Sequence, residues 1–238
     1  MTGPLDIHVG YDIREPLSYE VFRSSLERRS SQPLRIRPLM QRALRHEGLY
    51  LREHVEKDGQ TWDVVSGAPM STEFAITRFL VPHLQGSGWC LFGECDMLAL
   101  ADIAALFALA DDRYAVMCVQ HDYQSRGTFK KDGCAQVPYA RKNWSSLMLI
   151  NASHRANRRL TLDMVNTLPG RDLHRFCWLS DDEIGALPVE WNYLVGEAMP
   201  DVQPKILHYT NGTAETAAAP WLHEAMRLRR PLPAENAA

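Results

Sequence analysis

Two acidic residues, Glu94 and Asp96, directly follow an apolar run at residues 89–93. A strand that is apolar on both faces is typical of the centre of a helix-covered sheet, whose ligands collect beyond the carboxyl ends of the strands. Residues two apart on an extended chain project to the same side. Carboxylate oxygens suit Mg²⁺ or Mn²⁺, and two protein carboxylates leave coordination positions open for phosphate oxygens. The pattern indicates a divalent metal site; the alternative is a turn with two solvated acids.

The elements that must position these acids alternate between strands and helices. Residues 5–11 and 34–39 have the pattern of strands, and residues 16–29 between them that of a helix. This βαβ order implies an α/β fold with a parallel sheet. The alternation continues with a helix over 73–84, the acid-bearing strand over 89–93, a helix over 103–109, strands over 114–119, 146–150 and 205–209, and helical residues over 154–179 and from 220.

Two stretches interrupt this alternation. Residues 41–67 are rich in Arg, His, Glu and Gly, and we expect an insertion with a short helix or a hairpin. Residues 124–142 are polar and are expected to form a loop. Asp102 precedes the helix at 103–109 and is expected to cap it.

The overall composition is that of one globular domain. The chain has 238 residues, 45% of them apolar and 23% charged, which is enough length for one substantial core. The formal net charge is −3, so the overall balance does not favour nucleic acid as a partner. We expect any polyanion that the protein binds to be small or to be met by a local group of charges.

The cysteines and the apolar segments indicate where in the cell the protein is expected. The five cysteines are odd in number and lack C-x-x-C spacing, which favours free thiols in a reducing cytoplasm. The N-terminus lacks the basic stretch and apolar segment of a signal peptide. Residues 97–110 form the longest apolar stretch and are shorter than the ~20 residues of a membrane-spanning helix. We therefore expect a cytoplasmic protein with at most peripheral membrane contact.

Taken together, the order of the motifs resembles the GT-A fold glycosyltransferases, and most closely the family-8-like bacterial enzymes that use nucleotide sugars. The resemblance covers residues 5–212, and implies a Rossmann-like, mostly parallel sheet with helices on both faces. It also implies one such domain over 1–219, followed by a C-terminal helix and a disordered tail over 220–238. The motifs that carry it are residues 9–12 (VGYD), 72–82 (TEFAITRFLVP), 92–98 (FGECDML), 143–151 (NWSSLMLIN), 181–192 (DDEIGALPVEWN) and 208–212 (HYTNG).

In enzymes of that kind an acid-x-acid motif and a late histidine bind a divalent cation. The resemblance puts Glu94, Asp96 and His208 in these positions, holding Mn²⁺ or Mg²⁺ against the diphosphate of a UDP-sugar. Taken alone, a histidine just after a strand is more often a structural residue. The first acid of the motif is normally aspartate, so the geometry at Glu94 is open and Asp96 is the firmer ligand. Many family members also place a lysine after the histidine, and here Arg14, Arg78 or Lys142 could supply that charge.

The resemblance assigns further residues to the nucleotide sugar. Tyr11 and Asp12 fall where the first strand meets uracil and ribose, and the ring of Tyr11 offers a stacking face; an ordinary turn is the alternative. Arg78 lies on a helix of otherwise apolar spacing, so its burial requires a carboxylate partner, Asp96 or Asp12, and a role in donor binding is compatible with that. The residues after the next strand fall where the donor or the acceptor should lie: Gln120, His121 and Asp122.

Three adjacent acids match the segment that borders the reacting carbon in family-8-like enzymes. Ser180 and Glu183 fit a helix capping box, which explains Glu183 structurally. Asp182, with Asp181 beside it, is therefore the preferred catalytic candidate. The resemblance favours retention of configuration, although the sequence does not measure the geometry that decides it.

These inferences predict a metal-dependent glycosyltransferase that moves a hexose from a UDP-sugar to a glycan, lipid-linked or small glycoside acceptor. A non-catalytic nucleotide-sugar-binding protein is one alternative, because Glu94 and the missing lysine can mark a decayed site. A metal-dependent phosphohydrolase or nucleotidyltransferase is another, because paired carboxylates and a histidine also serve phosphoryl transfer. Neither a phosphate-binding G-x-x-x-x-G-K-[ST] loop nor an H-E-x-x-H helix is present.

The C-terminal helix has two interpretations. Its apolar residues recur at helical spacing and arginines follow: Trp221, Leu222, Ala225 and Met226, then Arg227, Arg229 and Arg230. Such a stripe either docks on the domain, which we favour because the stripe is short, or lies on an anionic membrane surface.

Overall fold

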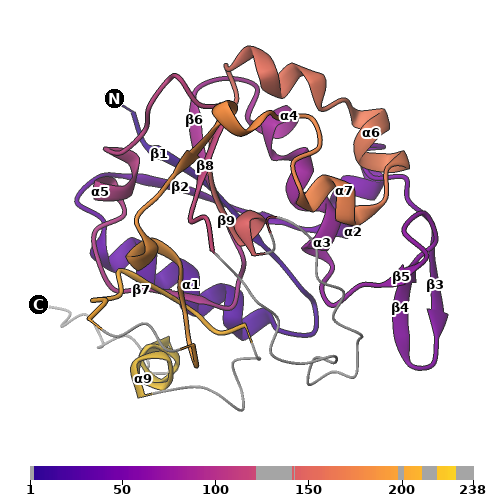
Figure 1. Cartoon of the computed structure of the whole chain (residues 1–238). Helices are drawn as coiled ribbons and strands as arrows, with labels where there is room; N and C mark the ends of the chain where they lie inside the picture. Colours follow the sequence, from indigo (N-terminus) through magenta and orange to yellow (C-terminus); the bar gives the residue numbers. More distant parts are fainter. Residues whose placement is uncertain (1–2, 122–140, 142, 198–200, 211–218, 229–238) are drawn as a thin grey trace, which may run out of the picture.

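A computed structural model describes residues 3–121, 141, 143–197, 201–210 and 219–228. Its centre is a twisted sheet with helices on both faces, and a small hairpin projects from one side (Figure 1). The predicted α/β class with a Rossmann-like, mostly parallel sheet is confirmed. In the described part of the chain no helix is both long enough and apolar enough to cross a membrane.

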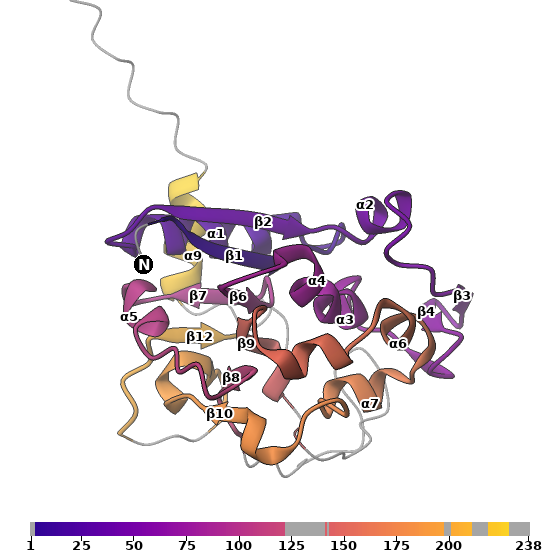
Figure 2. The same cartoon turned by 90° about the horizontal axis from the view of Figure 1, so that it is seen from above.

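The main sheet has six strands among the described residues, in the order β10-β8-β9-β6-β1-β2 (Figure 2). Only β9 runs antiparallel to its neighbours; the other strands run in one direction. Their carboxyl ends therefore share one edge of the sheet. The strands are β1 (Leu5–Gly10), β2 (Leu34–Leu39), β6 (Trp89–Gly93), β8 (Val116–Cys118), β9 (Leu147–Asn151) and β10 (Ile184–Ala186).

Two glycines show how tightly the helices cover the two faces near this edge. β1 leads through α1 (Pro16–Arg29) to β2, and β2 leads back past β1 to β6. Because such crossovers are right-handed, the two connections lie on opposite faces. A Cβ atom at Gly10 would lie 2.5 Å from the ring of Phe74, and one at Gly93 would lie 2.9 Å from the ring of Phe22. Side chains at these two strand ends would push the covering helices away.

The helix expected over 73–84 forms as three short pieces: α3 (Phe74–Thr77), η1 (Arg78–Leu80) and α4 (Val81–Gln85). Pro82, which lacks a backbone N–H, lies in the first turn of α4. The helical residues expected over 154–179 are also divided, into η3 (Arg155–Arg159), α6 (Leu162–Thr167) and α7 (Gly170–His174). Pro169 separates α6 from α7. α5 (Ala104–Phe107) forms as expected, and Oδ1 of Asp102 accepts from the N–H of Ala104 at 2.9 Å.

A second, smaller sheet carries the late histidine. It consists of β7 (Met97–Ala99), β12 (Ile206–His208) and β11 (Tyr193–Leu194). β12 pairs antiparallel with β7, with His208 opposite Met97. This pairing places the end of β12 beside the residue that follows Asp96.

The insertion at 41–67 contains both a short helix and a hairpin, as predicted. They are α2 (Gln41–His46), β3 (His54–Lys57), β4 (Gln60–Asp63) and β5 (Ala68–Pro69). Arg52 is fully buried, pairs with Asp63, and donates to the backbone carbonyls of Val165 and Leu168 at 2.9 and 2.8 Å. These bonds attach the hairpin to α6.

The C-terminal helix, α9 (Ala219–Leu228), is docked on the domain against α1 (Figure 2). Trp221 and Ala225 are buried in a small apolar cluster with Tyr209, and Glu224 is bound by Arg28 and Ser24 of α1. Leu222 and Met226 face outward. The docked interpretation of this helix is confirmed.

Candidate metal and donor site

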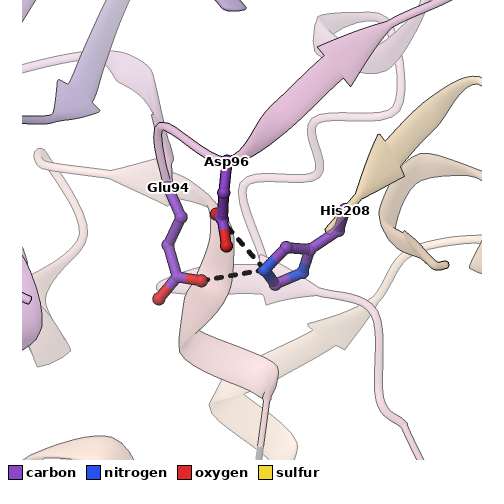
Figure 3. Close-up of side chains that lie close together, drawn as sticks. All are labelled: Glu94, Asp96 and His208. Carbon is purple, nitrogen blue, oxygen red and sulfur yellow. Dashed lines mark ion pairs between the residues drawn. The ribbon is translucent and has the colours of Figure 1, made fainter. Parts of the chain in front are cut away.

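Glu94, Asp96 and His208 converge at the carboxyl edge of the main sheet (Figure 3). One ligand atom from each lies within 4.8 Å of the others. Nε2 of His208 is 2.9 Å from Oε2 of Glu94 and 3.5 Å from Oδ1 of Asp96. The histidine is buried, whereas each carboxylate retains about one fifth of its exposure, at 18% and 21%. The three residues that the sequence predicts as ligands therefore lie together in the structure, and we call them the triad.

The backbone holds the triad from three elements. The N–H of Glu94 donates to the carbonyl of Ser146 at 3.1 Å, which ties the end of β6 to η2 (Trp144–Ser146). The carbonyl of Asp96 accepts from the N–H of Tyr209 at 2.9 Å, which ties it to the residue after His208. The triad is thus attached to both sheets.

A chain of hydrogen bonds orients the ring of His208. Ser146 donates its hydroxyl hydrogen to the carbonyl of Asn143 at 2.7 Å, and accepts from Nδ2 of Asn192 at 2.8 Å. Oδ1 of Asn192 is then left to accept from Nδ1 of His208 at 3.0 Å. Because a metal-bound histidine usually donates its other ring N–H to such an oxygen, this chain leaves Nε2 as the coordinating atom.

Arg78 pairs with Glu94, and not with Asp96 or Asp12 as expected from the sequence. Its Nη2 lies 2.6 Å from Oε1 of Glu94, and it also donates to the carbonyls of Phe74 and Ser145. Burial acts to raise the pKa of Glu94, but the charges and hydrogen bonds of Arg78 and His208 outweigh it and hold that pKa well below its usual range. Glu94 is therefore an anion with one oxygen held by Arg78 and the other facing His208.

The surroundings of Asp96 favour a cation beside its carboxylate. Its Oδ1 is buried and has no hydrogen-bond partner among the described residues. Burial raises the pKa of this carboxyl group; the charge of His208 opposes the rise, and that of Glu94 adds to it. A divalent cation would satisfy the buried oxygen and stabilise its charged form. Two carboxylates and one imidazole are suitable ligands for Mn²⁺ or Mg²⁺, so the residues present fit the expected metal.

The expected nucleoside residues lie at the end of β1. Asp12 is buried and accepts from the backbone N–H of Glu73 at 3.1 Å, and its two oxygens receive Nε and Nη2 of Arg14 at 2.9 and 2.6 Å. Arg14 itself is 58% exposed. The ring of Tyr11 packs edge-on against Tyr19, with 5.5 Å between the ring centroids.

The residues after β8 lie at the same edge. Gln120 is exposed and donates to the carbonyl of Ile184 at 3.4 Å. The carbonyl of His121 accepts from Nε1 of Trp144 at 3.1 Å. Two other candidates, Asp122 and Lys142, lie outside the described residues.

Asp181 and Asp182 lie elsewhere, which differs from the expectation. They form η4 (Asp181–Glu183), which directly precedes β10. Since β10 runs parallel to β8, residues that precede β10 lie at the amino edge of the sheet, opposite the triad. Asp181 is 93% exposed and pairs with Arg141, and Asp182 is exposed. The structure does not bring either acid to the triad.

The structural role of Glu183 is confirmed. Its side chain accepts from the N–H of Ser180 at 3.0 Å, which completes the capping box, and it also pairs with Arg159.

Sequence reasoning missed Asn192 and Ser146 as functional candidates. Both lie within motifs that carry the resemblance, but neither is a metal ligand or a charged group. A polar residue that is fully buried, as Asn192 is, requires a specific partner. The available signal was an amide within the otherwise apolar residues 191–195, and it does not name His208 as that partner.

Known structures resemble this fold closely enough to identify it. The galactosyltransferase LgtC, solved with donor and acceptor sugar analogs, matches with a TM-score of 0.60 and 15% identity over 97% of this chain and 98% of that chain. The bifunctional glycosyltransferase WbbM matches with a TM-score of 0.57 and 14% identity over 88% and 46%. GlyE of Streptococcus pneumoniae matches with a TM-score of 0.57 and 15% identity over 94% and 61%. The chain thus spans about half of WbbM and three fifths of GlyE. At these identities the likeness shows the fold, that of the GT-A-type glycosyltransferases.

One relative is much closer in sequence. No protein-family model matches the chain. Protein CDI of Arabidopsis thaliana is 49% identical over 215 residues, which cover 88% of this chain and 78% of that protein. At this identity and coverage, the chain, which has a GT-A-type fold, belongs to the same family as Protein CDI.

Proposed function

We propose that this protein is a metal-dependent glycosyltransferase, similar to the family-8 enzymes, that transfers a hexose from a UDP-sugar. Its acceptor is a glycan, a glycolipid or a small glycoside. The proposal includes Mn²⁺ or Mg²⁺ as the cofactor, a cytoplasmic location, and retention of configuration at the transferred carbon. The fold supports the reaction class, and the residues at the carboxyl edge of the sheet support the donor.

The observation that carries the proposal is the triad together with its support. Glu94, Asp96 and His208 bring two carboxylates and one imidazole to one place, and Oδ1 of Asp96 is buried without a hydrogen-bond partner among the described residues. Asn192 holds Nδ1 of His208, so that Nε2 faces the two carboxylates. These are features of a built metal site, because an incidental group of solvated acids would not require an oriented histidine.

The chemistry that such a site supplies matches the needs of sugar transfer. As the bond from the sugar to the diphosphate breaks, negative charge grows on the leaving diphosphate. A divalent cation stabilises that charge as a Lewis acid without a proton transfer.

The residues of the chain perform the binding and the orientation. Arg78 keeps Glu94 ionised and holds one of its oxygens, and Asn192 holds the ring of His208. At the end of β1, Tyr11 and Asp12 are the proposed contacts for uracil and ribose. The position of Asp182 at the other edge of the sheet removes it from the proposed machinery.

Incubation with Mn²⁺ and a panel of nucleotide sugars tests the function. Release of UDP from one donor is expected, either by transfer or by slow hydrolysis, and it should cease when the metal is chelated. Release of inorganic phosphate or UMP instead would indicate the phosphohydrolase or nucleotidyltransferase alternative. Binding of a nucleotide sugar without any release would indicate a non-catalytic protein. The matched control is Asp181→Asn, which changes an exposed acid that precedes β10 and is not part of the triad.

A further inference from the structure

A histidine near the triad has one ring nitrogen that lacks a hydrogen-bond partner in the described part of the chain. His121 follows β8 at the carboxyl edge of the sheet, and its Nε2 is buried and has no hydrogen-bond partner among the described residues. A buried polar atom left in this state costs about 1–3 kcal/mol. Native proteins keep few such atoms, and each requires an explanation, of which a functional role is one.

The position of His121 is fixed at both ends. Its carbonyl accepts from Nε1 of Trp144, and its ring lies near the backbone of Asn192, whose carbonyl acts to raise the pKa of the ring. The side chain of Asn192 holds His208, so one residue orients both histidines. An imidazole that is held in this way keeps its free nitrogen directed at one place.

The protonation state of the ring decides what His121 can bind. Burial, and after it the charge of His208, lower the pKa of His121 to about 4 against the opposing effect of the Asn192 carbonyl, so the ring is neutral near pH 7. In a neutral imidazole one nitrogen carries the hydrogen and the other accepts. The carbonyl of Asn192 favours a hydrogen on the nitrogen that faces it, and Nε2, which has no partner among the described residues, is left as an acceptor. An ionised phosphate oxygen has no hydrogen to give, whereas a hydroxyl group does.

The order of strands along the sheet edge suggests which hydroxyl this is. Tyr11 and Asp12 follow β1, the triad acids follow β6, and His121 follows β8 farther along the same edge. A nucleotide sugar is also linear, with the nucleoside, the diphosphate and the sugar in that order. His121 is not part of the group of possible metal ligands among the described residues, and the strand order puts it on the side of the triad away from Tyr11 and Asp12.

We propose that Nε2 of His121 accepts a hydrogen bond from a hydroxyl group of the transferred sugar, and so contributes to the choice of sugar. This inference rests on the proposed function. It assigns to His121 a contact with the sugar itself, and none with the metal or the diphosphate.

His121→Asn separates these contacts. Asparagine keeps an N–H near the position of Nδ1 for the carbonyl of Asn192 but has no acceptor near Nε2. Calorimetric titrations with Mn²⁺ present would compare UDP with UDP-glucose, UDP-galactose and UDP-xylose. We expect the affinity for UDP to stay within about twofold, and the affinity for the preferred UDP-sugar to fall about three- to tenfold. For one deoxy analogue of that sugar, the wild type and the variant should bind equally.

Three results would overturn the inference while leaving the proposed function intact. The first is an equal loss of affinity for UDP and for the UDP-sugar in the variant, and the second is no loss of affinity for either. The third is a difference in affinity between the wild type and the variant that persists with every deoxy analogue. A wild-type protein that binds neither UDP nor any UDP-sugar would instead overturn the proposed function, and the inference with it.

A measurement on the unaltered protein guards against a variant that does not fold. With Mg²⁺ present, the ¹⁵N resonance of Nε2 of His121 should shift when the UDP-sugar is added and should not shift with UDP alone. The same shift with both ligands would contradict a contact to the sugar.

Discussion

Replacement of Asn192 by leucine tests whether the oriented ring of His208 is what makes the triad a metal site. Asn192 is 0% exposed, and both of its polar side-chain atoms are used, at 3.0 Å to Nδ1 of His208 and 2.8 Å to Oγ of Ser146. Leucine has the same branching, although its methyl groups are larger than the amide atoms that they replace. The change therefore removes two hydrogen bonds and adds some steric crowding, which lowers the stability but does not by itself turn the ring of His208.

We expect the leucine variant to lose both stability and metal affinity. Without Asn192, the Nδ1–H of His208 is buried and unpaired, which lowers the free energy of unfolding by about 1–3 kcal/mol. The ring can also turn, or carry its hydrogen on Nε2, where it blocks coordination. Removal of such a supporting bond typically lowers metal affinity by about 10- to 100-fold, which corresponds to about 1.4–2.7 kcal/mol.

Asn192→Asp is the matched control. It keeps an acceptor for the Nδ1–H, and its charge makes the imidazole a stronger ligand. Free Mn²⁺ is followed by electron paramagnetic resonance during titration of the wild type and both variants, and thermal unfolding is measured on the same samples. We expect the aspartate variant to bind Mn²⁺ at least as tightly as the wild type. Wild-type affinity in the folded leucine variant, or equal losses in both variants, would refute the reasoning.

Three further predictions concern other parts of the chain. Asp96→Asn should abolish metal-dependent release of UDP with little change in melting temperature, because it removes a ligand and no core packing; full activity that still requires Mn²⁺ would show that Asp96 is not a ligand. Glu183→Gln should lower the free energy of unfolding by about 1 kcal/mol or less through the weakened capping box, whereas Asp182→Asn should leave UDP release unchanged; a large loss of turnover in the latter would restore its catalytic role. Burial raises the pKa of Glu224, but the hydrogen bonds and charge of Arg28 outweigh it and lower that pKa, so the docked α9 is stabilised at neutral pH and this contribution is lost as the pH falls through the lowered pKa. In urea titrations the destabilisation caused by Glu224→Gln should therefore be largest near pH 7 and should shrink as the pH falls below 4.5, and a constant difference would contradict this.

The sequence by itself determined the class of fold and the presence of a site. The alternation of apolar strands with helices predicts a parallel sheet, and the run at 89–93 followed by two acids predicts a metal site at its carboxyl edge. The caps at Asp102 and Ser180, and the hairpin within 41–67, are also visible locally. These features depend on residues that are only a few positions apart, so the spacing of residue types along the chain is enough to predict them.

Only the tertiary structure decided which distant side chains meet. Asp96 and Asp12 were the expected carboxylate partners of Arg78, and its position beside β6 pairs it with Glu94 instead. Asn192 carries no sign in the sequence that it holds His208, 16 residues away. The acids at 181–182 precede a strand whose direction in the sheet places them at the opposite edge from the triad, and helical spacing did not reveal which face of α9 is buried. The physical reason is that strand order, strand direction and helix docking follow from packing between segments far apart in the chain, which the local period of hydrophobic residues does not encode.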